Sequence, residues 1–229
     1  MRTHTFDVRA QRPFASGASF LIGYAWNHER RQEWFDDIAQ YRVLQTNGEE
    51  GWEWRPTDSP THRVTAALTV RLPFGRAQRF GTDIPRALDL AIGGWQYSAV
   101  AKYYSGRPLL FTTSYVVSGD PTVDNPTRDR WFDTSKFAVQ DSFTPRSNPW
   151  YFDGLNGPGT FITDMTLTKM FDVTSRYRLE ARIEAYNALN SIVWDNPDLN
   201  LASSNFGKVT RKRLAYNGRE IQFGLRFVF

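Results

Sequence analysis

The chain has 229 residues and a net charge of +4 at pH 7, from 28 Lys and Arg against 24 Asp and Glu. Charge this balanced and dispersed argues against a nucleic-acid-binding protein, and the absence of cysteine excludes disulfides and thiolate metal sites. Aromatic residues make up 15% of the chain although mean hydropathy is −0.51. No window approaches about 18 consecutive apolar residues, so the sequence excludes a membrane-spanning helix and favours alternating strands joined by polar loops.

Seven segments alternate apolar and polar residues with the period of two that is typical of strands. In the third segment, for example, Val64 and Leu68 fall on one face, and Arg63 and Thr65 fall on the other. Residues 83–90 are expected to form a helical turn or two, and residues 206–210 are a candidate extension of the sheet. The predicted strands are residues 3–11, 18–26, 61–72, 95–104, 160–171, 177–185 and 221–229.

The connections between these strands alternate in length. Short or medium connections follow the odd strands and long ones follow the even strands, which is the asymmetry of outer-membrane barrels, with periplasmic turns and extracellular loops. Strands of about 9–12 residues are near the length that crosses a bilayer when tilted. A soluble sandwich has no reason to sort its loops onto two ends. The long connections are residues 28–60, 107–158 and 187–218.

The predicted fold is therefore all-β: an antiparallel transmembrane β-barrel segment of about seven strands with long extracellular loops. Only a closed barrel satisfies every backbone group in lipid, and single-chain bacterial barrels normally have an even number of strands. The first residues, 1–9, also lack the apolar stretch of a signal peptide. We therefore expect residues 1–229 to be a partial barrel whose plug and N-terminal strands are absent.

In a bilayer the polar set of each strand is expected to face the lumen. Near the midplane, Arg or Lys toward lipid costs about 2–4 kcal/mol, whereas a wet lumen accepts charge. On the sixth strand, the residues of the polar set alternate between positive and negative charge. They can pair with polar residues on the seventh strand and with Asp164 on the fifth. The alternative is the solvated face of a soluble sheet. The predicted lumen-facing residues are Arg178, Glu180, Arg182, Glu184, Gln222 and Arg226.

Three segments near the C-terminus carry a family resemblance: residues 182–190 (RIEAYNALN), 205–210 (NFGKVT) and 219–229 (REIQFGLRFVF). Together they resemble the C-terminus of TonB-dependent receptors, most closely the Oar-like branch. The resemblance implies a plugged outer-membrane barrel of about 22 strands, embedded in outer-membrane lipid and driven by TonB acting through the missing N-terminal part. It also implies an assembly signal, read by the barrel assembly machinery, at Phe223, Leu225, Phe227 and Phe229.

Tryptophans in the long loops are the candidate ligand contacts, because indole rings stack on sugars and other apolar faces. The alternative is that these rings pack on one another. The candidates are Trp52 and Trp54 in the first long loop, and Trp131 and Trp150 in the second.

Other chemistry is weakly indicated. His4, His28 and His62 lie near the outer ends of predicted strands and could converge on a metal, although scattered rim histidines are usually solvated. An oxygen-rich stretch could bind calcium, but its spacing is not that of an EF-hand loop. The oxygen-rich stretch comprises Asp120, Asp124, Asn125, Asp129 and Asp133. From these patterns we predict no catalytic residue, no metal and no cofactor.

The functional expectation is an outer-membrane, TonB-dependent receptor that takes up a ligand whose identity the sequence does not indicate. It is not expected to be an enzyme or to bind nucleic acid. One alternative is a soluble β-sandwich that binds carbohydrate through Trp-rich loops. A third candidate, an outer-membrane barrel enzyme, is the weakest because no histidine lies in the middle of a predicted strand.

Overall fold

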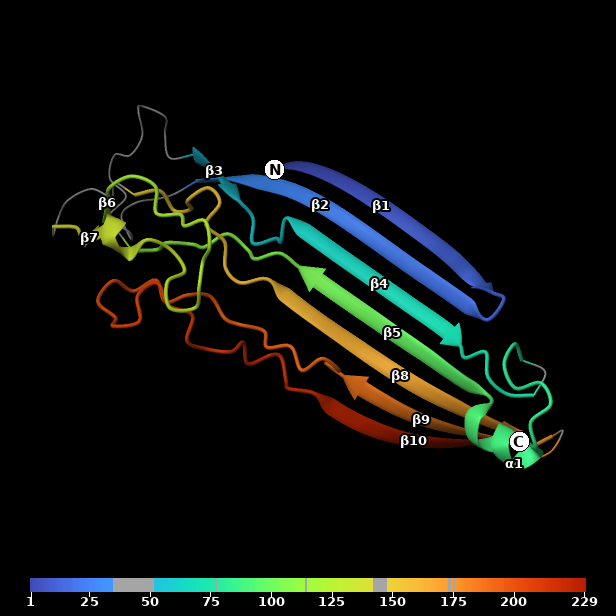
Figure 1. The fold of residues 1–229 in the computed structure, drawn as a ribbon. Coiled ribbons are helices and arrows are strands. Elements are labelled where there is room, and N and C mark those ends of the chain that lie inside the picture. Colours follow the sequence, from blue (N-terminus) through green and yellow to red (C-terminus); the bar gives the residue numbers. More distant parts are fainter. Residues whose placement is uncertain (35–51, 77, 114, 142–147, 173, 175) are drawn as a thin grey trace.

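The structure is a computed structural model that describes residues 1–34, 52–76, 78–113, 115–141, 148–172, 174 and 176–229, and its main feature is one antiparallel sheet (Figure 1). All seven predicted strands form and are neighbours in chain order. The short strand β3 (Trp52–Pro56) pairs with the outer end of β2. The seven long strands are β1 (Arg2–Ala15), β2 (Ala18–Trp34), β4 (His62–Arg71), β5 (Trp95–Tyr104), β8 (Thr160–Asp172), β9 (Arg178–Tyr186) and β10 (Glu220–Val228).

The connections are sorted onto the two ends of the sheet, as predicted. Figure 1 shows the long loops at one end, here called the loop end, and the chain's C-terminus with helix α1 at the other, the turn end. The turn between β1 and β2 is tight because Ser16 and Gly17 both have positive φ, 52° and 82°, which suits a two-residue hairpin turn. No helix in the described part of the chain is long and apolar enough to span a membrane.

Four short elements complete the fold. Helix α1 (Arg86–Ile92) lies in the β4–β5 connection, where the sequence predicted a helical turn. The loop between β5 and β8, residues 105–159, was expected to have little regular structure. It contains β6 (Tyr115–Val117), the 3₁₀ turn η1 (Thr134–Lys136) and β7 (Phe137–Val139), with β6 and β7 paired.

The strand register joins the apolar residues of neighbouring strands into one continuous apolar face. Residues that pair directly across antiparallel strands point to the same side of the sheet. One apolar row runs through Phe20, Leu68, Ala99, Met165, Ala185 and Ile221. A matching row on the opposite, polar face runs through Ser19, Thr69, Ser98, Thr166, Glu184 and Gln222.

Within the described part of the chain, no second sheet covers the apolar face. Ile22 is 50% exposed, and Phe223 and Leu225 are 76% and 72% exposed. The chain has 15394 Å² of accessible surface, whereas a compact soluble protein of its mass has about 10,600 Å². The alternative of a soluble β-sandwich is therefore wrong, because a sandwich covers such a face with a second sheet.

The sheet is open. Its edge strands are β1 and β10, and they do not pair with each other or with any other described strand along their outer edges. Backbone groups at such an edge need partners in lipid, because hydrocarbon offers none.

Candidate functional site

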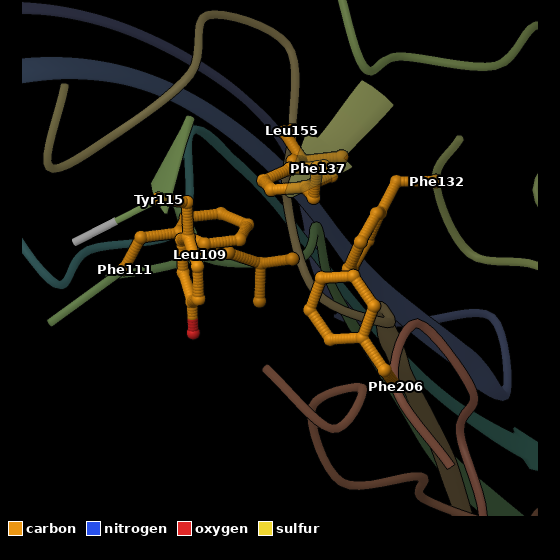
Figure 2. Packing of buried hydrophobic residues seen from close by; sticks show 7 residues of the cluster. All are labelled: Leu109, Phe111, Tyr115, Phe132, Phe137, Leu155 and Phe206. Atoms are coloured by element: carbon orange, nitrogen blue, oxygen red, sulfur yellow. The ribbon is translucent and has the colours of Figure 1, made fainter. Parts of the chain in front are cut away.

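The best-packed part of the described chain is the loop end. A cluster of buried side chains forms a core there, to which the β5–β8 loop contributes most residues and the β9–β10 loop, residues 187–219, contributes one. We call this core, with the two loops that build it, the loop unit. Figure 2 shows its seven central residues, Leu109, Phe111, Tyr115, Phe132, Phe137, Leu155 and Phe206.

Aromatic geometry gives the loop unit a defined packing. Phe111 is completely buried and stacks on Phe137, with ring centroids 5.6 Å apart, while Phe132 meets Phe206 edge to face at 5.2 Å. Such pairs add about 0.5–1.5 kcal/mol each beyond their buried area. The sequence proposed residues 206–210 as an extension of the sheet, and this is wrong: Phe206 leaves the sheet to fill the core of the loop unit.

Hydrogen bonds join the two loops to each other and also connect distant parts of the β5–β8 loop. The Tyr115 hydroxyl donates to the Leu199 carbonyl, and the Tyr115 backbone N–H donates to Asn148 Oδ1 at 2.8 Å. Trp131 donates through its backbone N–H to the Gly207 carbonyl at 2.8 Å and through its indole N–H to the Asn156 carbonyl at 2.7 Å. Trp131, one of the predicted ligand contacts, therefore helps to hold the loop unit together.

Two of the four candidate tryptophans come together in a pocket of 430 Å³, here called the aromatic pocket. Trp54 reaches it from β3 and Trp150 from the β5–β8 loop. Trp52 also lies in β3, but its side chain is outside the described part of the structure. The aromatic and charged residues that line the aromatic pocket include Arg30, Trp54, Arg55, Trp150, Tyr151 and Asp153.

Cations accompany the rings of the aromatic pocket. The Arg55 guanidinium lies 4.3 Å from the centroid of Trp150, and the Arg2 guanidinium lies 4.4 Å from the centroid of Trp54. Arg30 donates to the Trp54 carbonyl at 3.5 Å. Because aromatic faces and arginines share this wall, it suits a ligand with a ring face and a negative charge.

A second pocket of 300 Å³, the arginine pocket, lies where the polar face of the sheet meets the loops. Arg63, Tyr104 and Thr160 form one row across β4, β5 and β8 on the polar face. The β5–β8 loop adds Arg107, and the β9–β10 loop adds Arg213.

The charges of the arginine pocket are only partly neutralised. Arg107 pairs with Asp58 at 2.7 Å. Arg63 and Arg213 make no ion pair with any described residue. Guanidinium groups without an acidic partner at the edge of a pocket favour carboxylate or phosphate groups on a ligand. Sequence reasoning missed this pocket, because its arginines lie far apart in the chain.

The predicted charged row on β9 lies on the polar face as expected. Arg182 bridges its own neighbours on the strand, with Nη2 2.6 Å from Glu180 Oε1 and Nη1 3.4 Å from Glu184 Oε1. In the register, Arg226 lies opposite Glu180 and Gln222 lies opposite Glu184. Arg178 instead pairs with Asp172 at 3.5 Å.

Asp164 does not join that charged row through any described ion pair. Its Oδ1 accepts a hydrogen bond from the backbone N–H of Asn187 at 2.9 Å, where β9 ends. The carboxylate expected to pair with the row therefore fixes the start of the β9–β10 loop.

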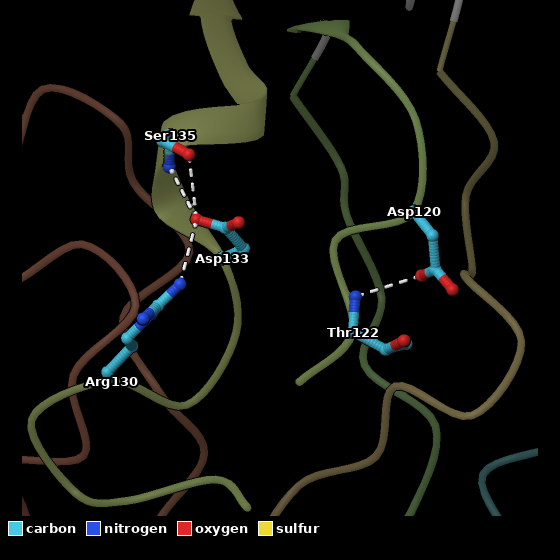
Figure 3. A network of polar contacts seen from close by, with 5 residues as sticks. All are labelled: Asp120, Thr122, Arg130, Asp133 and Ser135. Atoms are coloured by element: carbon cyan, nitrogen blue, oxygen red, sulfur yellow. Dashed lines mark hydrogen bonds and ion pairs between the residues drawn. The ribbon is translucent and has the colours of Figure 1, made fainter. Parts of the chain in front are cut away.

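Two of the aspartates considered for calcium, Asp120 and Asp133, instead organise turns in the β5–β8 loop, as Figure 3 shows. Asp133 accepts from the hydroxyl of Ser135 at 2.8 Å and pairs with Arg130 at 3.3 Å. The Ser135 hydrogen bond lowers the pKa of Asp133 from its ordinary value. Asp120 accepts from the Thr122 backbone N–H at 2.9 Å, and this bond lowers its pKa. These carboxylates are engaged with the protein itself.

The three histidines share the loop end of the apolar face. His4 and His28 are direct register partners, and His62 Nδ1 lies 2.9 Å from the Tyr24 hydroxyl. Within the described ranges, no three His, Cys, Asp or Glu residues are grouped so that they could hold a metal ion.

The predicted assembly-signal residues of β10 lie on the apolar face. Phe223, Leu225 and Phe227 pair with Ile183, Ala181 and Leu179 of β9. At the turn end, the Phe227 ring stacks on Tyr177 with centroids 5.7 Å apart, and Phe229 follows at 6.2 Å from Phe227. This strand therefore presents a row of exposed apolar side chains at the edge of the sheet.

Residues 2–222 match a family model described as an outer membrane beta barrel domain. Searches of curated proteins and of solved structures gave no match. The match covers all of β1 to β9 and the beginning of β10.

Proposed function

Because the chain belongs to the outer membrane beta barrel domain family, we propose that its sheet is one arc of the barrel of a TonB-dependent receptor. The chain is an outer-membrane protein, so its apolar face meets lipid and its polar face meets the lumen. The resemblance of residues 182–190, 205–210 and 219–229 to the C-terminus of such receptors supports the finer assignment. In this proposal, the strands that complete the wall, the plug and the segment that contacts TonB lie outside these residues.

The single observation that carries a receptor function is the packed loop unit beside the lumen mouth. A pore that only admits small solutes has no need of two arginine-bearing pockets among its loops. Here the aromatic pocket lies among the outer loops, and the arginine pocket lies at the end of the polar face. The arrangement supports capture of a ligand by the loops followed by entry into the lumen.

We propose an anionic oligosaccharide as the ligand class, and the residues of the two pockets support it. Indole and phenol rings stack on the faces of sugar rings, and guanidinium groups pair with carboxylates bidentately. A neutral sugar would leave Arg63 and Arg213 without acidic partners, whereas the carboxylate of a uronate would pair with them. The proposed role is binding and transport, with no enzymatic step.

Binding can be tested with the natural full-length protein in detergent, with trigalacturonate as the probe and neutral maltotriose as the matched control. The charged probe is expected to bind more tightly than the neutral one, with affinity that falls as salt rises. The double variant Arg63→Gln, Arg213→Gln should lose most of that difference. Equal binding of the two probes by the unaltered protein would contradict the ligand class.

TonB dependence needs a separate measurement in the bacterium that makes the protein. Uptake of the bound probe should fall to the same low level when either the gene or tonB is deleted, and the double deletion should add nothing. Uptake that survives deletion of tonB would overturn the TonB assignment while leaving the binding result intact.

A further inference from the structure

The described residues of the β4–β5 connection, 72–76 and 78–94, form a well-defined structure at the turn end of the sheet (Figure 1). Phe74 and Phe80 are paired through their backbones in an isolated parallel β-bridge, and the Arg76 backbone N–H donates to Asp89 Oδ1 at 2.7 Å. Gly75 has φ of 116°, and a Cβ atom there would lie 2.6 Å from Asp89 Oδ1. Only glycine fits at this position, so the connection and α1 are closely packed together.

This well-formed segment leaves its large apolar side chains uncovered. Leu88 and Ile92 lie one turn apart on the same side of α1. None of the α1 residues is buried. The exposed apolar residues of the connection are Phe74 (44%), Phe80 (50%), Leu88 (46%), Leu90 (47%) and Ile92 (38%).

Helix α1 lies against the lipid-facing side of the sheet. Trp95 and Lys169 are register partners on the apolar face. The Trp95 indole N–H donates to the Ala91 carbonyl at 2.9 Å, and the Lys169 ammonium donates to the Gly93 carbonyl. The end of α1 is therefore held by two side chains of the apolar face, and its exposed residues continue the surface that meets lipid.

Lys169 is a charged residue on the apolar face that the β4–β5 connection covers. Its side chain is a cation in the apolar set of β8, yet it is only 3% exposed. The rings of Trp95 and Phe171 flank its Nζ at 5.4 and 5.1 Å, and Asp89 of α1 attracts it. The connection thus shields the charge of Lys169 from the acyl chains, where an exposed lysine is costly.

Three arginines belong to the same segment as the exposed apolar residues. Arg76, Arg79 and Arg86 are exposed, and none of them makes an ion pair with a described residue. The Arg79 guanidinium lies 5.5 Å from the ring centroid of Phe80. Apolar side chains interleaved with unpaired cations are the pattern of segments that lie in a membrane interface.

We propose that residues 73–76 and 78–94 lie in the periplasmic leaflet of the outer membrane. The apolar side chains of α1 and of the Phe74–Phe80 bridge enter the boundary between headgroups and acyl chains, and the three arginines pair with lipid phosphates. The side is periplasmic because α1 shares its end of the sheet with the tight turns. The lipid surface is favoured over a protein partner because α1 is attached to the face that already meets lipid.

The test uses single-cysteine probes in the natural full-length protein, because residues 1–229 contain no cysteine. Any native cysteine elsewhere is first replaced by serine. An environment-sensitive fluorophore is attached at Leu88→Cys or Leu90→Cys, and the protein is placed in phosphatidylcholine–phosphatidylglycerol vesicles with nitroxide-labelled phospholipids. Leu225→Cys on the apolar face and Ser98→Cys on the polar face serve as lipid and lumen controls.

Labels at Leu88 and Leu90 should emit at shorter wavelength than the Ser98 label and be quenched several-fold more by the nitroxide lipids. Unquenched, water-like emission at both positions, with the Leu225 label quenched, would overturn the proposal. Protection from both the nitroxide lipids and aqueous iodide would also overturn it, because it would mean that protein covers the segment.

A second arm tests the charges. The variant Arg76→Gln, Arg79→Gln, Arg86→Gln should fold, because these side chains make no described ion pair. Adding phosphatidylglycerol to phosphatidylcholine vesicles should raise the Tm of the unaltered protein and of the lumen-facing control Lys102→Gln, and should raise the Tm of the triple variant much less. An equal rise in all three proteins would exclude phosphate pairing by these arginines.

Discussion

The guanidinium of Arg55 lies 4.3 Å from the centroid of the Trp150 ring, and both residues are buried. Arg55 belongs to β3 and Trp150 to the β5–β8 loop, so this one contact joins two segments that are far apart in the chain. A desolvated cation over an indole contributes about 2 kcal/mol. The contact therefore positions one wall of the aromatic pocket as well as lining it.

Arg55→Gln is expected to loosen the contact between β3 and the β5–β8 loop, because it replaces the cation over the Trp150 ring with a shorter, uncharged polar side chain. Proteinase K added to intact cells should cleave the outer loops several-fold faster than in the unaltered protein. Arg55→Lys retains a cation over the ring and is the matched control. Equal cleavage of the Gln variant and the unaltered protein would show that the contact does not hold the loops.

Phe111→Ala should unfold the loop unit while the strands stay intact. Phe111 is fully buried among Phe132, Phe137 and Tyr115, and removing a buried phenyl ring costs about 3–5 kcal/mol. Hydrogen exchange should show lost protection in residues 109–139 with unchanged protection in β8 and β9. Val139→Ala, at a side chain 78% exposed, should leave both regions unchanged.

Leu225→Arg should lower the free energy of unfolding in lipid vesicles by about 2–4 kcal/mol, because it places a cation toward the acyl chains near the middle of β10. Gln222→Arg on the same strand should have little effect, since it points to the polar face opposite Glu184. Urea titrations in vesicles measure both. A larger loss for Gln222→Arg than for Leu225→Arg would reverse the assignment of the two faces.

Phe227→Ala combined with Phe229→Ala should reduce assembly into the outer membrane, because the proposed assembly signal is the apolar row of β10. The measurement is the fraction of the natural protein that runs as a heat-modifiable barrel in the membrane fraction. Val228→Ala, on the other face of the strand, is the control. Normal assembly of the double Phe variant would argue against recognition of this row by the barrel assembly machinery.

The Asp198 carboxyl should make the loop unit sensitive to acid. Hydrogen bonds from the Ser203 side chain and the Asn200 backbone N–H lower its pKa below the ordinary value of 3.8. The folded state thus binds fewer protons than the unfolded state in this range, so the contribution is present above pH 3.8 and is lost as pH falls through the folded pKa. Hydrogen exchange of residues 198–209 should depend on pH below 4 more steeply than in Asp198→Asn. Identical pH profiles would remove Asp198 as a cause.

The strands could be predicted because their signal is local. Alternation of side chains depends only on neighbouring residues, so Val64 and Leu68 could be placed on one face, and Arg63 and Thr65 on the other, without knowing what lies beside them. The order of short and long connections then predicted the two ends of the sheet. Phe206 shows the limit of such reasoning: its short segment looked like strand, and long-range packing against Phe132 decided otherwise.

The candidate site could be predicted only in part, for the same reason. Trp54, Trp131 and Trp150 look alike as loop tryptophans. In the structure Trp131 hydrogen-bonds two backbone carbonyls inside the loop unit, whereas Trp54 and Trp150 share a pocket wall. The arginine pocket had no signal at all, because Arg63, Arg107 and Arg213 meet only through the fold.

The amino-acid sequence by itself determined which residues of each strand are apolar, where the seven long strands lie in the chain, and which connections are long. These are properties of short stretches of sequence. On every strand the apolar side chains face lipid and the polar side chains face water, so each strand can be read by itself. The sequence did not determine strand length, because β2 continues to Trp34 where the sequence predicted an end at residue 26. Only the tertiary structure decided that the apolar rows align into one face, that α1 is fixed to that face by Trp95 and Lys169, and that the loops share one core. Those outcomes depend on strand register and on contacts between residues far apart in the chain, and no local pattern encodes either.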